Sequence, residues 1–290
     1  MTFLRQAELL IGPLTEAEGG GPRNEAYRIV SGGLDTDLRI RFSIDLSATS
    51  EPNKIVLAVT NLASERWARM AVKNTLVQLS VGYQDTGLKL LARGGIASCA
   101  TRREGDDRVT VIEARDGYGP QTRGMLNRTY GGGMPLKDVF RDLARSLPGI
   151  DLGSIDVTGN LPPKGVHASG RVAETLNWLA DRYGVTWSIQ GGVLQVIKDG
   201  QGLPGEALVI SSRNRNLISL SPSASGPDAA QDGVEIIAQL DPSIRPGSVV
   251  SVDSHDQPNL NGFYVAQSVN ASGDTHGDDW TMTIRSTARP

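Results

Sequence analysis

The stretch that decides the fold is Leu38-Arg39-Ile40-Arg41-Phe42-Ser43-Ile44-Asp45-Leu46, in which apolar and polar residues alternate strictly. Successive side chains of a β-strand point to opposite faces, so the alternation places all the apolar side chains on one face of the strand. A sheet with one buried and one solvated face is typical of antiparallel β-structure. The sequence therefore predicts a half-buried antiparallel strand here.

The β pattern continues as far as residue 115. After a turn signal at Glu51-Pro52-Asn53, a β-rich apolar run follows at 54–62, and the polar stretch 63–73 could hold a short helix. Further strands are expected at 75–82, 88–100 and 108–114, with turns at 84–87 and 104–107. We expect residues 1–115 to form a first domain, a small β-barrel or sandwich.

The hydrophobic period changes after residue 115. Leu136, Val139, Phe140, Leu143, Ala144 and Leu147 follow helical spacing up to Pro148-Gly149. A second helix is predicted at 170–183, with Ser169 as N-cap and Gly184 at its end. Two short β runs separated by Gly191-Gly192 predict a hairpin with a two-residue turn. Residues 116–205 are therefore expected to form an α+β module.

The last part of the chain returns to β-structure. A Gly/Ser/Pro-rich stretch at 221–233 is typical of a mobile loop or linker. Alternating runs follow at 234–240, 248–252, 262–271 and 280–287, and short runs at 208–210 and 217–220 could join either β-module. We expect a second β-domain at 206–290, with strands that could be shared with the first. At the level of residue identity the sequence has no clean internal repeat.

Composition narrows the functional classes. The chain has 290 residues and a formal charge of −3, so it has no global basic field that would drive nucleic-acid binding. Its single cysteine, Cys99, excludes an internal disulfide framework and is expected to be a small buried hydrophobic residue. The N-terminus does not resemble a signal peptide, and no stretch approaches the roughly 20 apolar residues needed to cross a bilayer.

Candidate metal ligands are sparse. His167, His255 and His276 lie far apart and in no ligand spacing, so structural or surface roles are expected. The polar run from Gly273 to Trp280 could offer carboxylates to Ca²⁺, but it lacks the length and closing Glu of an EF-hand. We expect a hairpin turn there, in which Asp accepts local backbone hydrogen bonds.

Catalytic signatures are also missing from the sequence. The glycine clusters at 19–21, 32–33 and 131–133 lack a following Lys-Ser/Thr, and no Gly-x-Ser-x-Gly elbow occurs. The adjacent carboxylates Asp106-Asp107 and Asp278-Asp279 do not face each other across a substrate. Trp178 and Trp187 are expected to pack together in the α+β core rather than to bind sugars. We predict no catalytic, cofactor or metal site, and no enzymatic activity.

Several short motifs resemble the baseplate hub proteins of contractile phage tails, the tail hub or late control protein D-like family. These are Leu38–Ile44, Pro52-Asn53-Lys54 and the strand end Thr60-Asn61-Leu62-Ala63, where the family usually has Ser in place of Ala63. Similar segments continue at Leu79–Tyr83, Gly94-Gly95-Ile96 and Ala114–Gly117, and the C-terminal ones are Leu240–Gly247, Asn261–Val265 and Gly273–Trp280.

The resemblance implies a structural subunit with two related tube-type antiparallel β-barrels flanking a helix-helix-hairpin module. Three chains would then form a homotrimeric ring that adapts the sixfold tail tube to a threefold spike. The implied partners are the tube or its initiator, a separate spike protein, the wedge proteins and the tape-measure protein. DNA would pass through the lumen without sequence-specific binding during ejection. The implied location is the virion tail baseplate, after synthesis in the host cytoplasm.

Two alternatives stay open at this point. The chain could be another tail component, such as a tube protein or a distal-tail adaptor, in which case it would carry one barrel instead of two. It could also be a cell-wall hydrolase carried on a tail. The loops at 19–21 and 221–233 are candidates for segments that become ordered between neighbouring subunits, or are surface loops.

Overall fold

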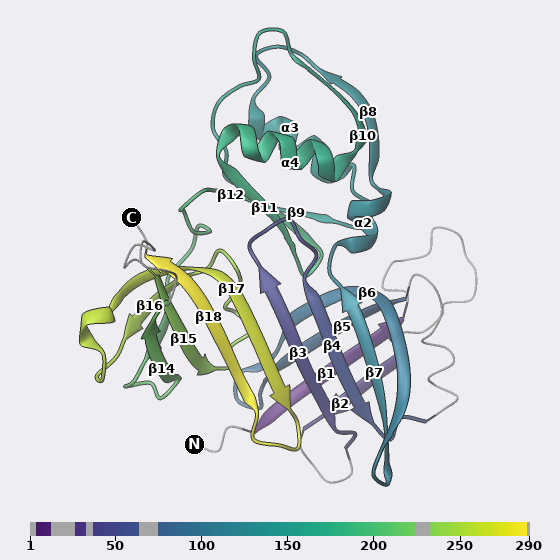
Figure 1. Ribbon diagram of the computed structural model, residues 1–290, viewed down its shortest axis with the longest axis vertical. Helices are drawn as coiled ribbons and strands as arrows, with labels where there is room; N and C mark the ends of the chain where they lie inside the picture. The colour runs from purple at the N-terminus through teal and green to yellow at the C-terminus, as the bar shows by residue number, and fades with distance from the viewer. Residues whose placement is uncertain (1–3, 13–26, 33–36, 64–74, 224–232, 289–290) are drawn as a thin grey trace.

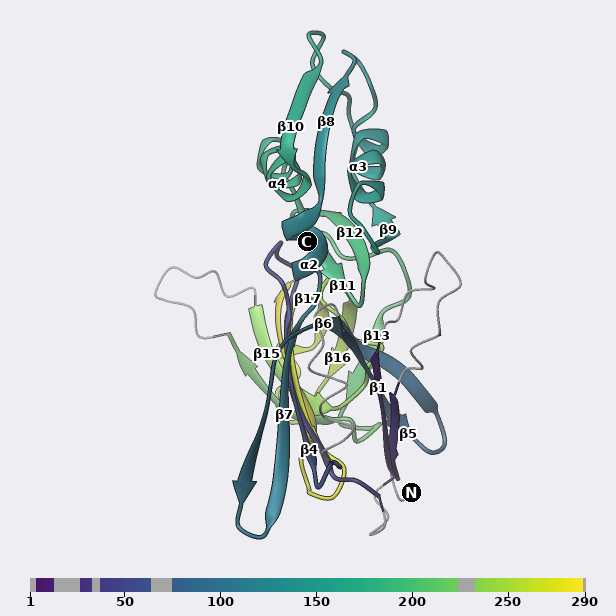
Figure 2. The same cartoon turned by 90° about the vertical axis from the view of Figure 1, so that its right-hand side faces the viewer.

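The computed structural model describes residues 4–12, 27–32, 37–63, 75–223 and 233–288. A broad β-body carries a smaller module of helices and short strands at one end (Figure 1), and the view turned by 90° shows the module at the same end (Figure 2). The glycine cluster at 19–21, residues 64–73 of the possible short helix and residues 224–232 of the Gly/Ser/Pro-rich stretch lie outside the described residues.

The described residues of the first β-module form seven strands. They are β1 (Arg5–Gly12), β2 (Tyr27–Ser31), β3 (Ile40–Ser47), β4 (Lys54–Thr60), β5 (Leu76–Tyr83), β6 (Gly87–Glu104) and β7 (Asp107–Arg115). In β3 the side chains of Ile40, Phe42, Ile44 and Leu46 are buried, whereas Ser43 and Asp45 are exposed. The prediction of a half-buried antiparallel strand is confirmed.

The α+β insert follows β7 directly. Its elements are α2 (Tyr118–Arg123), β8 (Met125–Tyr130), α3 (Leu136–Arg145), β9 (Asp151–Ile155), β10 (Val166–Arg171), α4 (Val172–Tyr183), β11 (Val185–Gln190) and β12 (Val193–Lys198). Gly191 and Gly192 have φ angles of 64° and 85° and form the two-residue turn between β11 and β12. The predicted hairpin and both predicted helices are confirmed, as is Gly184 in left-handed conformation at the end of α4.

Two predictions within the insert are wrong. Ser169 does not cap the second helix, because it pairs with Asn127 inside β10 and α4 begins only at Val172. Trp178 and Trp187 do not pack together in the core. Trp187 is 2% exposed, but Trp178 is 45% exposed, and the Arg182 guanidinium lies over its ring on the outer side of α4. Because residues up to Arg171 pair with β8, the helix begins only at Val172. The buried side of α4 carries Val172, Leu176, Leu179 and Ala180, so Trp178 faces solvent.

The second β-module contains β13 (Leu208–Ser211), β14 (Leu217–Pro222), β15 (Gly233–Gln239), β16 (Val249–Asp253), the 3-10 helix η1 (Pro258–Leu260), β17 (Gly262–Asp274) and β18 (Trp280–Ala288). The hairpin between β17 and β18 contains the predicted turn. In that turn the Asp274 carboxylate accepts a 3.0 Å hydrogen bond from the His276 N–H, as expected for a local Asp turn.

One 13-stranded sheet joins the two β-modules. Its main path runs β14-β15-β18-β17-β3-β4-β7-β6-β5-β1-β2, and β16 and β13 branch from β17. The connection between the modules is the antiparallel pairing of β17 with β3, from Ser268↔Ser47 to Asp274↔Arg41. Within the described residues this path is open at both ends and does not close on itself.

The two β-modules repeat the same strand arrangement. The order β3-β4-β7-β6-β5-β1 in the first corresponds, strand for strand along the chain, to β14-β15-β18-β17-β16-β13 in the second. A register shift interrupts β6 between Ile96 and Ser98, and β17 has one at the corresponding place, between Ala266 and Ser268. The units differ at one edge, where β1 is antiparallel to β5 but β13 is parallel to β16.

Among the residues that the structure describes, the buried side chains form two cores. One continuous core extends through both β-modules and includes Leu57, Ile112, Ile236 and Ile284. The other core lies inside the insert around Phe140, Leu176 and Trp187. The protein is thus mainly antiparallel β-structure with an α+β insert, as predicted, and its two β-modules are built on a shared sheet.

Candidate functional site

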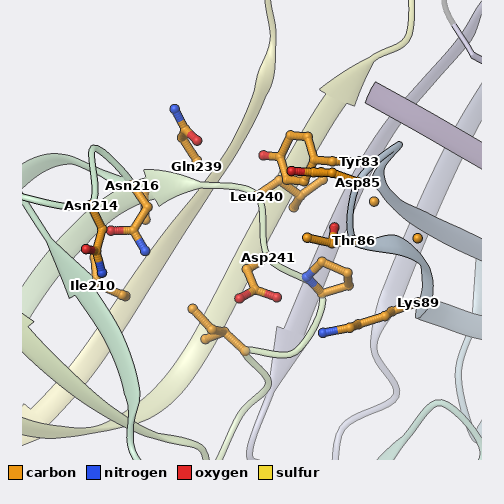
Figure 3. Close-up of a pocket in the computed structure, with 15 residues that line it drawn as sticks. Tyr83, Asp85, Thr86, Lys89, Ile210, Asn214, Asn216, Gln239, Leu240 and Asp241 are labelled. Carbon is orange, nitrogen blue, oxygen red and sulfur yellow. The ribbon is translucent and has the colours of Figure 1, made fainter. Parts of the chain in front are cut away.

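A small pocket lies between the two β-modules. The turn between β5 and β6 forms one wall, and the segment between β13 and β14 together with the end of β15 and the residues after it forms the other (Figure 3). Its volume is about 200 Å³, which is below the roughly 300–1,000 Å³ of typical small-molecule sites. The size fits a side chain or a few waters better than a metabolite.

The pocket has a buried apolar floor and a polar rim. Ile210, Ala238, Leu240 and Ile244 lie in the floor and are at most 2% exposed. Asp241 lies between the asparagines 214 and 216 on one side and Tyr83, Thr86 and Lys89 on the other (Figure 3). The Lys89 ammonium donates a 2.8 Å hydrogen bond to Ser243 Oγ, and the Ser243 N–H donates one of 2.9 Å to Asp241. The Lys89 bond joins the first β-module to the second, and the Ser243–Asp241 bond is local to the second module.

The pKa of Tyr83 is shifted by its surroundings in this pocket. The pKa of its hydroxyl is raised to about 12, mainly by burial and to a smaller extent by the negative charges of Asp241 and Asp85, while the positive charge of Arg5 opposes the rise. The hydroxyl is therefore protonated at neutral pH. It is a hydrogen-bonding group between the two β-modules and not a candidate base.

A buried polar junction fixes the insert on the sheet. Asp116, 3% exposed, follows the end of β7 and accepts hydrogen bonds from the backbone N–H groups of Gly191 and Gly192 at 2.5 and 3.2 Å. Burial raises the pKa of Asp116 to about 7, although these bonds and the charges of Arg93 and Arg245 act to lower it. Burial lowers the pKa of Arg245, while Asp116 opposes that change.

Asn53 forms the second half of this junction. Its side-chain amide donates to the Ile189 carbonyl at 2.9 Å and to Gln190 Oε1 at 3.0 Å. Gln190 in turn donates to the Ser47 carbonyl at 2.6 Å, and Asn53 Oδ1 accepts from the Ser47 N–H. The Pro-Asn turn after β3 is therefore a docking point for the β11–β12 hairpin. The turn signal was visible in the sequence, but its partner 136 residues later was not.

The side of the central sheet that faces away from the core is polar and continuous across both modules. Cross-strand rows place Thr283, Asn270, Asp45, Lys54 and Arg115 side by side on β18, β17, β3, β4 and β7. A neighbouring row contains Thr281, Ser272, Ser43, Val56 and Glu113. Small hydroxyl and amide side chains and charges of both signs make this face hydrophilic without a strong net field.

A second hollow, of about 370 Å³, lies on this polar face beside the Pro-Asn turn. Lys54, Arg115 and Arg285 contribute positive charge to its lining, while Asp45 and Glu51 contribute negative charge. Arg285 is held by Glu235 at 3.0 Å, and Asp45 accepts a hydrogen bond from the Asn270 amide. The balance of charges gives no selective anion or cation site.

The sheet has an unpaired edge at each end of its central part. Pairing of β6 with β5 reaches Gly95, so in the described residues 98–104 of β6 pair only with β7. Likewise β14 pairs only with β15 among the strands that the structure describes. Unpaired backbone N–H and C=O groups at such edges are ready templates for pairing with another chain.

The residues considered as ligands or nucleophiles lie apart. His167, His255 and His276 are exposed, on β10, before η1 and in the β17–β18 turn. His167 Nδ1 is 2.9 Å from Thr129 Oγ1, and His276 Nδ1 is 3.0 Å from Thr275 Oγ1. Cys99 lies half-buried on β6, where burial raises the pKa of its thiol. Among the described residues, no three His, Cys, Asp or Glu side chains are grouped as metal ligands.

The polar run at Gly273–Trp280 has a structural role. Asp274 accepts hydrogen bonds of 3.0 and 3.1 Å from Arg39 Nε, and Trp280 packs edge-to-face on Phe42 with ring centroids 5.4 Å apart. Burial raises the pKa of Asp274, but the bonds from Arg39 and the His276 N–H outweigh it and hold the pKa below its usual value. In the glycine cluster 131–133, Gly132 lies against the backbone of Pro163, where a Cβ would clash.

Comparisons with known proteins were made by sequence and by structure. No family model and no curated protein matches the sequence. The fold is similar to a tail protein from Neisseria meningitidis MC58, with a TM-score of 0.64, 11% identity, and 97% and 96% of the two chains covered. It is also similar to the prophage MuSo2 43 kDa tail protein from Shewanella oneidensis, with a TM-score of 0.62, 11% identity and 97% of each chain covered.

A third similar structure is the E. coli c3393 protein, described as a type VI secretion component that resembles the T4 phage tail proteins gp27 and gp5. Its TM-score is 0.61 at 13% identity, with 89% of this chain and 76% of that chain covered. In the described part of the chain, no helix is long and apolar enough to span a membrane. Two of these three neighbours are tail proteins and the third is a type VI secretion component described as similar to tail proteins. At these identities the likeness establishes a shared fold.

Proposed function

We propose that this protein is a structural subunit of the baseplate hub of a contractile phage tail or a related injection particle. Three copies form a ring that adapts the sixfold tail tube to a threefold spike and surrounds the conduit for DNA and the tape-measure protein. The proposal includes three domains, at residues 1–115, 116–205 and 206–290, and a location in the virion baseplate.

The observation that carries this proposal is the duplicated strand arrangement. Two six-strand units in one chain give three copies six units, which is the number that a sixfold tube requires. The fold shared with tail proteins from Neisseria meningitidis and Shewanella oneidensis supports the same assignment. A tube protein with one unit per chain accounts less well for the duplication.

The polar sheet face supports a role as a channel wall. Its mixed charges and hydroxyl side chains, such as Ser43, Ser272 and Thr281, offer neither an apolar surface nor a dense positive field to a passing polyanion. Such a wall would let DNA move without tight binding. In this proposal the insert lies outside the ring and contacts the wedge or spike proteins.

Native mass spectrometry and electron microscopy test the proposal. We expect a species of three times the 30.9 kDa chain mass and rings with threefold symmetry and six peripheral lobes. A protein that stays monomeric at all concentrations and forms no ring in the assembled particle would contradict it. The hydrolase alternative is tested by zymography on peptidoglycan, where we expect no clearing; a zone lost on substitution of one carboxylate would identify an enzyme instead.

A further inference from the structure

The pocket between the two β-modules contains two carboxylates without an ion-pair partner. Its lining includes Asp85 and Asp241 together with the basic residue Lys89. The Lys89 ammonium is bonded to the hydroxyl of Ser243 at 2.8 Å. In the part of the chain that the structure describes, neither Asp85 nor Asp241 takes part in an ion pair. The charged residues of this lining therefore leave one negative charge in excess.

Asp241 is positioned to bind a cation at the wall of the pocket. Its side chain is half-buried, and Figure 3 shows it between the asparagines 214 and 216 on one side and Tyr83 on the other. Its Oδ1 accepts the 2.9 Å hydrogen bond from the Ser243 N–H, whereas its Oδ2 accepts none from the described residues. One oxygen is thus held in place, and the other is available to a donor from outside.

The negative charges act on Tyr83, which forms part of the same lining. The pKa of the Tyr83 hydroxyl is raised mainly by burial and, to a smaller extent, by the charges of Asp241 and Asp85. Arg5 opposes them, but its guanidinium donates hydrogen bonds of 2.6 and 3.1 Å to two carbonyls of the β17–β18 turn. Arg5 is therefore bound to that turn and lies outside the lining of the pocket.

We propose that this pocket binds an arginine side chain of a partner protein. Its mouth is formed by exposed residues such as Thr86 and Asn214, so a side chain can enter from solvent. The methylene groups of the arginine lie on the buried apolar floor around Ile210 and Leu240, and its guanidinium donates to Asp241. In the proposed function the partner is another tail protein, and only this identification rests on that function.

The chemistry of the lining favours arginine over lysine. A guanidinium is planar and more weakly hydrated than an ammonium, so it is removed from water more easily over an apolar floor. It can also stack on an aromatic ring, which Tyr83 supplies, while it donates hydrogen bonds in its own plane to a carboxylate. A lysine ammonium lacks this planar geometry and is expected to bind more weakly.

Other occupants fit this pocket less well. An apolar side chain would displace water from Asp241 without replacing its hydrogen bonds, which is unfavourable for a charged group. An anion would meet the excess negative charge of the lining. The volume of about 200 Å³ has room for one side chain, and it is below the range of typical small-molecule sites.

Saturation-transfer difference NMR with short peptides tests the proposal on the full chain. The probe is acetyl-Gly-Arg-Gly-amide, and the matched control replaces arginine by citrulline, which has nearly the same shape without the charge. We expect saturable binding of the arginine peptide in the millimolar range, because one side chain buries little area. The citrulline peptide should bind at least about tenfold more weakly. The corresponding lysine peptide should bind more weakly than the arginine peptide, and the leucine peptide should not bind measurably.

Substitutions in and beside the pocket locate the binding. Asp241→Asn keeps an oxygen that can accept from the Ser243 N–H but removes the charge, so binding of the arginine peptide should weaken about tenfold. Asp85→Asn, at an exposed position, should weaken it about threefold. Lys89→Gln removes the opposing charge and should strengthen it about twofold. Asp256→Asn, an exposed carboxylate of the second β-module outside the lining, is the control and should leave binding unchanged.

Several results would overturn the arginine pocket. They are equal binding of the arginine and citrulline peptides, tighter binding of the leucine peptide, or no saturable signal up to about 20 mM arginine peptide. Binding that Asp241→Asn leaves unchanged would overturn it as well, because the peptide would then bind elsewhere. Each of these results leaves the hub proposal intact when rings are present. Binding with the expected effects of the variants, but without rings, would overturn the hub proposal alone.

Discussion

The Asp116 carboxylate accepts a 2.5 Å hydrogen bond from the backbone N–H of Gly191, which lies 75 residues later in the chain. The first residue of the insert thus holds the turn of the insert's last hairpin. The contact is buried, and the neighbouring Gly192 N–H shares it. This closed polar junction sets where the insert is attached to the sheet.

The Asp116→Ala substitution is expected to destabilise the protein by about 1–3 kcal/mol, because it leaves two buried N–H groups without an acceptor. Asp116→Asn retains one acceptor oxygen and should cost less. Chemical denaturation measures both. An exposed turn residue, Asp106→Ala, is the control and should stay within about 0.5 kcal/mol of the parent protein. Equal effects of Asp116→Ala and Asp106→Ala would show that the junction is energetically unimportant.

The same residue predicts a pH dependence. Its pKa in the folded protein, about 7, is above the ordinary value of 3.8, so the folded state binds more protons between these values. The contribution of Asp116 to stability is therefore greatest below about pH 4 and falls as the pH rises to about 7, by at most about 1.4 kcal/mol per pH unit. The difference in unfolding free energy between parent and Asp116→Asn, measured from pH 4 to 8, should show this slope. A difference that is constant with pH would contradict it.

The two tryptophans of the insert should differ strongly in their effect on stability. Trp187 is buried and donates a 2.8 Å hydrogen bond to Asn177 Oδ1, so Trp187→Ala is expected to cost about 3–5 kcal/mol. Trp178 is 45% exposed, and Trp178→Ala should cost less than about 1 kcal/mol. Thermal denaturation of the two variants checks the contrast. Similar losses from both would mean that Trp178 is covered in solution.

The exposed histidines are expected to be dispensable. His255→Ala and His276→Ala should each leave ring assembly and folding nearly unchanged, since their side chains lie at the surface, outside the two cores. Size-exclusion chromatography and metal analysis of the purified variants provide the readouts. Loss of a bound metal together with loss of folding in either variant would contradict this expectation.

The alternation at 38–46, the helical spacing from Leu136 to Leu147 and the Gly191-Gly192 turn determined the element types and their order from sequence alone, because these patterns are local. Local patterns failed where a long-range contact decides the outcome. Ser169 pairs with Asn127 in the β8–β10 ladder instead of capping the helix. Trp178 lies on the solvent-facing side of its helix instead of in the core.

Only the tertiary structure showed that β17 pairs with β3, that the two modules repeat one strand order and that Asp116 and Asn53 meet the hairpin of the insert. The repeat left no trace in residue identity, since any apolar side chain of suitable size can fill the core positions of a strand. Strand partners far apart in the chain are chosen by packing and backbone hydrogen bonding in three dimensions. The sequence pattern of a single strand cannot specify them.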